Sequence, residues 1–124
     1  MGDGPGTATI RVHDFTKNEP AGGLARIETT EPAAPGTTGY EEIEVSSIDA
    51  LVPADRQVSV IHMDLEGFEK KALAGARQTI LRCRPFLAIE GRIGAAWMNE
   101  MLGEEAYVAA SHFEKNQFFL PLPA

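Results

Sequence analysis

The stretch VSVIHMDLEGFEKKALAGARQTILRCRPFLAIE, residues 58–90, decides the fold. Residues 58–65 are nearly continuously apolar, which is typical of a central parallel strand buried on both faces. Residues 68–82 repeat apolar side chains at every fourth position, and this spacing predicts one amphipathic helix. Pro85 ends the helix, and residues 86–89 are predicted to form the next buried strand. Together these elements predict a βαβ unit with two parallel strands.

Acidic side chains follow both predicted strands of this unit. Asp64 and Glu66 come after the first strand, and Glu90 ends the second. Because ligands of open α/β sheets bind outside the carboxyl ends of the strands, we expect these carboxylates to face one cleft. Pairing Asp64 with Glu90 would raise the pKa of one of them and create a base. The alternative is structural: Asp64 would accept hydrogen bonds from the first helical amides, and Glu66 would favour the positive helix N-terminus.

The N-terminal third of the chain is predicted to be rich in β-strands. A Gly/Pro-containing leader at residues 1–6 is expected to be flexible. Alternation and β-branched residues predict strands at 7–15, 24–29 and 40–46. Residues 47–51 are predicted to form a short turn or helix before Pro53.

The C-terminal part is predicted to complete the sheet. A short helix is expected at residues 95–102, followed by two strands at 106–113 and 117–120 around the turn Glu114-Lys115-Asn116. We expect this hairpin to be antiparallel and to cap the sheet edge. The fold class is therefore α/β.

Composition excludes several kinds of partner. The net charge is −7, and nucleic-acid binding relies on Lys and Arg, so we expect no nucleic acid and no anionic membrane surface as partner. The sequence has no apolar run long enough for a membrane span, and no signal-peptide core. Its single cysteine, Cys83, cannot form a disulfide within the chain, which suits a reducing compartment. We therefore expect a cytoplasmic protein.

An ordered set of motifs resembles the C-terminal half of the FkbM-type methyltransferase domain. VIHMDLEGFE at residues 60–69 resembles the signature strand and acidic turn of that family. SIDAL at 47–51, LAGA at 73–76, RPFLAIE at 84–90 and NQFFLP at 116–121 resemble further family segments in the same order. The resemblance covers roughly residues 45 to 121, so residues 7–124 are predicted to form a single truncated domain with a partial Rossmann-like methyltransferase sheet.

The resemblance implies methyl transfer from S-adenosylmethionine, with a hydroxyl group of a small molecule or glycan as acceptor. Carried over residue by residue, it implies catalytic carboxylates and substrate-binding groups: Asp64, Glu66 and Glu90 as catalytic, and His62, Gly67 and Asn116 as substrate-binding. His62 departs from the family, which usually has Lys two positions before the acidic Asp. An oxygen-rich site of Asp64, Glu66, Glu90 and His62 would suit Mg²⁺ or Ca²⁺, but no standard ligand loop surrounds it, and we expect no metal.

The cofactor-binding residues cannot be named from this sequence. The family uses a glycine-rich turn after the first strand and an acidic residue at the end of the second, and neither is present. Residues 2–6 have glycines at alternate positions, but no strand precedes them. A non-catalytic half-domain, a subunit of a split enzyme and a small acidic binding module therefore remain alternatives. Since residues 58–65 would lack a neighbouring strand, we expect a homodimer or a partner chain.

Overall fold

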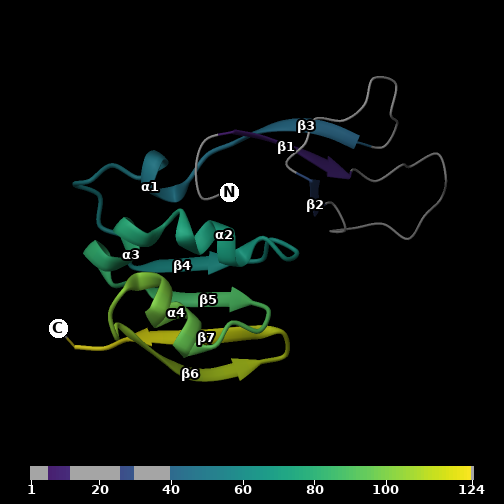
Figure 1. Cartoon of the computed structure of the whole chain (residues 1–124). Coiled ribbons are helices and arrows are strands. Elements are labelled where there is room, and N and C mark those ends of the chain that lie inside the picture. The colour runs from purple at the N-terminus through teal and green to yellow at the C-terminus, as the bar shows by residue number, and fades with distance from the viewer. Residues whose placement is uncertain (1–5, 12–25, 30–39, 124) are drawn as a thin grey trace.

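The computed structural model describes residues 6–11, 26–29 and 40–123, which form two β-sheets and four helices (Figure 1). The larger sheet has four strands in the order β4-β5-β7-β6. Its strands are β4 (Val60–Met63), β5 (Phe86–Glu90), β6 (Tyr107–Phe113) and β7 (Asn116–Pro121). β4 and β5 are parallel, and β7 is antiparallel to both β5 and β6. This arrangement confirms the predicted α/β class, the parallel βαβ unit and the antiparallel hairpin.

The smaller sheet contains the N-terminal strands. β1 (Gly6–Arg11), β2 (Arg26–Thr29) and β3 (Tyr40–Val45) are antiparallel, in the order β2-β1-β3. The three predicted strands are therefore present, and Gly6, expected to end the flexible leader, begins β1. The rest of that leader and residues 12–15 of the first predicted strand lie outside the described residues.

The predicted single helix at residues 68–82 is wrong, because the structure has two helices there. α2 spans Glu69–Ala74 and α3 spans Arg77–Cys83. Asp49, in the short helix α1 (Ile48–Leu51), caps the start of α3 at this break. Its carboxylate accepts hydrogen bonds from Gln78 N at 3.0 Å and Thr79 N at 2.8 Å, and its own N–H donates to Gly75 O at 2.8 Å. The apolar stripe stays continuous across the break, so periodicity alone could not reveal it.

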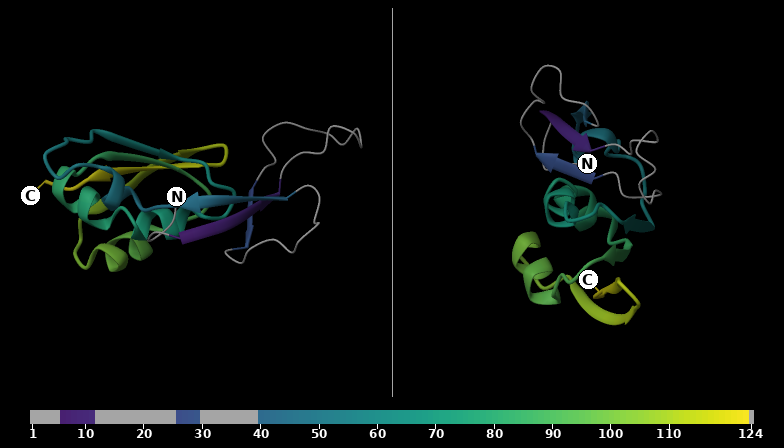
Figure 2. Two further views of the ribbon diagram at one scale, coloured as in Figure 1. Left: turned by 90° about the horizontal axis from the view of Figure 1, so that it is seen from above. Right: turned by 90° about the vertical axis from the view of Figure 1, so that its right-hand side faces the viewer.

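One face of the four-stranded sheet packs against the helices. The left view of Figure 2 shows the strands and helices as two layers. Residues of the strands that point toward α2, α3 and α4 (Ala95–Leu102) form the core with apolar residues of those helices. The core residues from the strands are Ile61, Met63, Leu87, Ile89, Tyr107 and Phe119.

The opposite face of the sheet is apolar and partly exposed. Val60 is 59% exposed and Leu120 is 45% exposed, while the rings of Phe86 and Phe118 stack with centroids 5.8 Å apart. Within the described residues, β4 pairs with β5 alone, so it is an edge strand. The prediction that residues 58–65 form a central strand buried on both faces is therefore wrong, whereas the expectation that they would lack one neighbouring strand is confirmed among the described residues.

A hydrogen bond made by the Tyr107 side chain connects the start of β6 to the residue just before β5. Its side chain is fully buried, and its hydroxyl donates a 2.7 Å hydrogen bond to Pro85 O. Burial raises the pKa of Tyr107 to about 12, above its ordinary value of 10.0. The neutral phenol is therefore the form that the folded chain stabilises.

Tyr107→Phe should lower the free energy of unfolding by about 1–2 kcal/mol below pH 10, because Pro85 O loses its buried donor. Since the folded pKa of Tyr107 is raised, its stabilisation is complete below the unfolded pKa of about 10 and declines as pH rises toward 12. Urea denaturation of both proteins across this range should show the difference shrinking. A difference that stays constant with pH would contradict this account.

Candidate functional site

Three carboxylates meet at the carboxyl ends of β4 and β5. Asp64 follows β4, Glu66 lies in the next turn, and Glu90 is the last residue of β5. One carboxylate oxygen from each lies within 4.8 Å of the others. Asp64 and Glu66 are exposed, and Glu90 is partly exposed. The structure thus brings together the three residues predicted to be catalytic, while their roles stay predictions.

Glu69 shapes the turn that presents this cluster, and sequence analysis missed it. Its side chain is buried, with Oε1 accepting from Leu65 N at 2.8 Å and Oε2 accepting from Gly67 N at 3.0 Å. These bonds close a turn in which Glu66 and Gly67 have φ values of 51° and 101°. Glu69 thus binds amides of the turn before α2, which differs from the binding of the first helical amides considered for Asp64. A carboxylate at the first position of a helix, after a Gly-containing turn, was the available signal.

The pKa of Glu90 is raised from its ordinary value of 4.5. The largest cause is the side-chain hydrogen bond with Asp64, followed by desolvation and by the negative charges of Asp64 and Glu66; Lys115 opposes the shift. The Glu90 carboxyl, hydrogen-bonded to Asp64, therefore keeps its proton to higher pH than an isolated glutamate side chain would. Because the folded pKa is raised, this group stabilises the fold most at acidic pH, and that contribution declines as pH rises through the raised pKa.

Asp64→Asn should bring the pKa of Glu90 back toward 4.5, because it removes a charged neighbour and the strongest hydrogen-bond acceptor. Titration of the Glu90 side-chain carbonyl carbon by NMR measures this directly. Glu105→Gln, at an exposed position at the far end of the sheet, is the matched control and should leave the Glu90 titration unchanged. An unchanged Glu90 titration in Asp64→Asn would show that the two groups do not interact.

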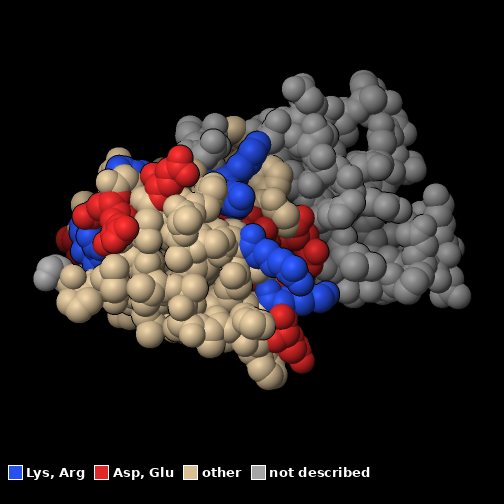
Figure 3. Space-filling model, turned by 60° about the horizontal axis from the view of Figure 1, so that its bottom comes forward, with Lys and Arg blue, Asp and Glu red and all other residues tan. Residues whose placement is uncertain are grey.

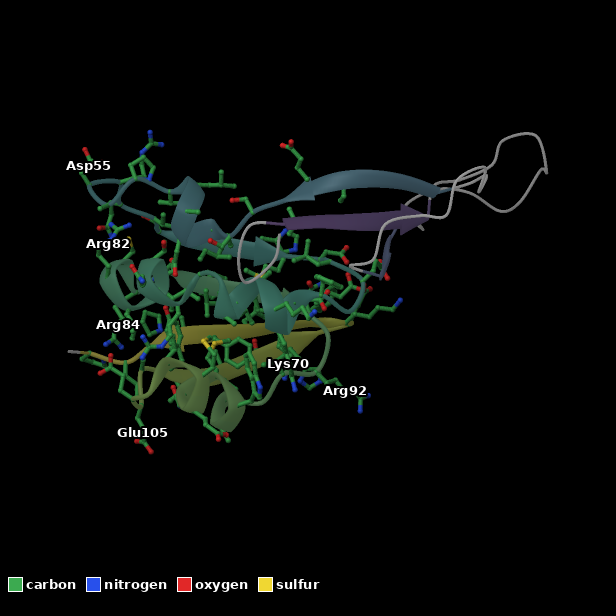
Figure 4. The ribbon with its side chains drawn as sticks, turned by 45° about the horizontal axis from the view of Figure 1, so that its top comes forward. Asp55, Lys70, Arg82, Arg84, Arg92 and Glu105 are labelled. Atoms are coloured by element: carbon green, nitrogen blue, oxygen red, sulfur yellow. The ribbon has the colours of Figure 1, made fainter. Side chains whose placement is uncertain are left out.

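Two pockets adjoin the cluster, one on each side of a shared wall. The wall consists of Glu90, Gly91 and Arg92. The larger pocket has a volume of about 730 Å³ and continues along the β6–β7 turn, where its other lining residues are Gly94, His112, Glu114, Lys115, Asn116 and Gln117. The smaller, about 460 Å³, continues along the acidic turn and the start of α2, with Glu66, Gly67, Glu69, Lys70 and Ile93. Figure 4 shows Lys70 and Arg92 at this end of the molecule.

Two hydrogen bonds connect the loop that contains this wall to the β6–β7 hairpin. Gly91, whose φ is 119°, donates its N–H to Lys115 O at 2.8 Å. Ile93 N donates a short hydrogen bond to the side-chain oxygen of Gln117. The loop between β5 and α4 is therefore joined by two hydrogen bonds to the β6–β7 hairpin, one at the turn and one at β7, and the sequence had indicated no role for Gln117.

The residues predicted to bind substrate separate in the structure. Asn116 lies opposite Glu90 in the β5–β7 register and lines the larger pocket; its Oδ1 is enclosed and accepts no hydrogen bond from the described residues. Gly67 lines the smaller pocket. His62 is exposed on the face of β4 that points away from the helices, and it lines neither of these pockets.

The same residues can be tested for metal and cofactor binding. Three carboxylate oxygens suit a hard cation such as Mg²⁺, but exposed acidic groups are common without an ion, and we assign no metal to them. S-adenosylmethionine fits less well. Among the described residues, β1 pairs with antiparallel strands on both of its sides, and β4 has no partner on its outer edge. These residues therefore form no complete cofactor cradle.

A family model described as the methyltransferase FkbM domain matches residues 3–119. A similar solved structure is the methyltransferase FkbM from Methylobacillus flagellatus KT, with 28% sequence identity and a TM-score of 0.47. The match covers 64% of this chain and 23% of that chain, so this chain spans less than a quarter of the length of that relative. No curated protein gives a match. No helix among the described residues is long and apolar enough to cross a membrane.

Proposed function

Because this chain belongs to the methyltransferase FkbM domain family, we propose that it supplies the acceptor side of a methyl transfer from S-adenosylmethionine to a hydroxyl oxygen. The observation that supports this proposal best is the meeting of Asp64 and Glu90 beside a pocket of about 730 Å³. A pocket of this size at the carboxyl ends of the strands is suited to a small molecule or to one unit of a glycan.

The carboxylates would act on the proton of the acceptor. Methylation of a hydroxyl group requires that its proton be removed, and the acceptor O–H would donate a hydrogen bond to the Asp64–Glu90 pair. The raised pKa of Glu90 makes its carboxylate a stronger base than an ordinary glutamate. The hydroxyl proton would pass to Glu90 and be shared with Asp64. Glu66, at the rim of the cluster, would be a further polar contact.

The alternative function, a partner-dependent half-domain, has its own support. The outer edge of β4 is unpaired among the described residues, and the side chains of Val60 and Leu120 are apolar and exposed. Both features suit a second polypeptide segment that extends and covers the sheet. Such a segment would supply the cofactor cradle that the described residues lack, from a second copy of this chain or from another chain. The chain would then be one subunit of a split enzyme, or a binding subunit without its own activity.

Three measurements test these proposals. Isothermal titration with S-adenosylmethionine and transfer of a labelled methyl group to hydroxylated acceptors should be carried out on this chain alone and with a chain carrying the first half of an FkbM-type domain. Methyl transfer by this chain alone, or by the two chains together, supports the proposed function. The absence of methyl transfer from both samples overturns it. Analytical ultracentrifugation tests the partner proposal, since a strictly monomeric species that is active alone would contradict it.

A further inference from the structure

We propose that β4 pairs with the β4 of a second copy of this chain, antiparallel across a two-fold axis, so that the two four-stranded sheets join into one continuous sheet. This inference rests on the partner-dependent alternative of the proposed function, for which it names the second polypeptide segment. Three features of β4 support the pairing: its free main-chain groups, its unprotected side chains and the opposite charges at its two ends.

The outer edge of β4 offers free main-chain hydrogen-bonding groups. Phe86 donates its N–H to Ser59 O at 2.9 Å, so the main-chain groups of Ser59 point toward β5. Because successive residues of a strand direct these groups to opposite sides, the N–H and C=O of Val60 and His62 point to the outer edge. Figure 1 shows β4 at the margin of the sheet, and no described strand pairs with its outer edge. Such a row of unpaired groups is a template for a further strand.

The side chains of β4 lack the features that keep an edge strand unpaired. Those features are a lysine or another charge, a proline, and a bulge. β4 has the sequence Val-Ile-His-Met, and its register with β5 is regular. β6, the other edge strand of this sheet, has a register shift against β7 between Ala109 and Ser111. The pairing of the sheet is therefore interrupted at the β6 edge, while the β4 edge is open to a further strand.

The direction of the main-chain groups limits which residues of two β4 strands can oppose one another. Outward-facing residues must pair with outward-facing residues, so the two-fold axis passes through a residue rather than between two residues. With the axis at Ile61, near the middle of β4, Val60 of each copy opposes His62 of the other. Arg56 lies five positions before Ile61 and Glu66 five positions after it, so this register brings Arg56 of one copy level with Glu66 of the other.

The two ends of β4 carry opposite charges. Before the strand, Arg56 and Arg82 are exposed, and Arg82 Nη1 donates a 2.6 Å hydrogen bond to Arg56 O. After the strand, Asp64 and Glu66 are exposed. Further charged residues are Asp55 beside Arg56, and Glu69, Glu90, Lys70 and Arg92 beside the acidic turn. Basic groups therefore outnumber acidic ones before β4, and acidic groups outnumber basic ones after it.

Antiparallel pairing brings the basic end of each β4 beside the acidic end of the other. Figure 4 shows Arg82 and Arg92 at opposite ends of the sheet, and Figure 3 shows charged side chains gathered at two ends with a largely uncharged surface between them. The two-fold axis makes the contact between Arg56 and Glu66 occur twice, whereas a parallel pair would place like charges side by side. Arg56 of the second copy then lies beside the carboxylate cluster, so each site gains a cation from the other copy.

Sedimentation equilibrium of the whole chain at micromolar concentrations tests the pairing, and it should show a reversible dimer. His62→Pro should abolish this dimer, because proline removes an outward N–H without removing a hydrogen bond to β5. Circular dichroism should show that the variant stays folded. A strictly monomeric original chain, or a dimer that persists in folded His62→Pro, would overturn the proposal.

A charge exchange tests the register without altering the main chain. Arg56→Glu should weaken the dimer by about tenfold, because it places a like charge opposite Glu66 of the other copy. The double variant Arg56→Glu/Glu66→Arg restores opposite charges and should recover the affinity. Lys115→Glu, exposed at the β6–β7 turn, changes the net charge as Arg56→Glu does and should leave the dimer unchanged. Equal weakening in Arg56→Glu and Lys115→Glu, or no recovery in the double variant, would overturn the proposed register.

The outcomes for the dimer and for methyl transfer are separate. Methyl transfer by a strictly monomeric chain would overturn only this inference. A dimer that responds to the variants as expected, but transfers no methyl group either alone or with a chain carrying the first half of an FkbM-type domain, would overturn only the proposed methyl transfer.

Discussion

Glu90→Gln should lower the rate of methyl transfer by about 10²–10⁴-fold in the complete enzyme, because the amide cannot take the hydroxyl proton. Asp64→Asn should also slow the reaction, since it removes the neighbour that raises the pKa of Glu90. Both substitutions preserve side-chain volume at exposed or partly exposed positions, so the fold should be retained. Single-turnover transfer of a labelled methyl group measures the reaction rate of each variant, and a thermal melt measures its stability separately.

The control for this prediction is Glu105→Gln. Glu105 is exposed, and Figure 4 shows it at the end of the molecule opposite Arg92, far from the carboxylate cluster. This variant changes the net charge by the same amount as the test variants and should transfer methyl groups at the original rate. If Glu90→Gln and Asp64→Asn also keep the original rate, neither carboxylate takes part in the reaction.

Glu69→Ala should lower the free energy of unfolding by about 3 kcal/mol, because two charge-assisted hydrogen bonds to backbone amides are lost. The amides of Leu65 and Gly67 would then lack their acceptors, and the positive φ of Glu66 would no longer be enforced. Urea denaturation at neutral pH measures this loss.

Glu100→Ala gives the matched comparison for Glu69→Ala. Glu100 is exposed on α4, and its replacement should change stability by less than about 0.5 kcal/mol. Equal losses in the two variants would show that Glu69 does not hold the acidic turn. Glu69→Gln should fall between them, since it keeps one oxygen acceptor without the charge.

The elements that could be predicted from sequence are those whose signals are local. Alternation predicted β1 and β3, and the run from Phe86 to Ile89 predicted β5 within one residue. The meeting of Asp64, Glu66 and Glu90 followed from general topology, because parallel strands end at the same edge of a sheet.

The features that could not be predicted from the sequence depend on contacts between residues far apart in the chain, or on the absence of a neighbouring strand beside β4 among the described residues. The gap between α2 and α3 depends on Asp49, which lies 29 and 30 positions before the amides that it binds. The exposure of Val60 could not be inferred from the sequence, because an apolar residue at this position is typical of a strand that is buried on both faces. The pocket wall depends on Gln117, which binds Ile93 across 24 positions.

The contact made by Asp49 limits how this βαβ unit can be moved between proteins. If residues 58–90 were grafted into another scaffold, the amides of Gln78 and Thr79 would lose the Asp49 carboxylate, and nothing within the graft replaces this cap of α3. The portable unit is therefore residues 47–90, in which Ser47 caps α1 and α1 in turn holds Asp49 in place.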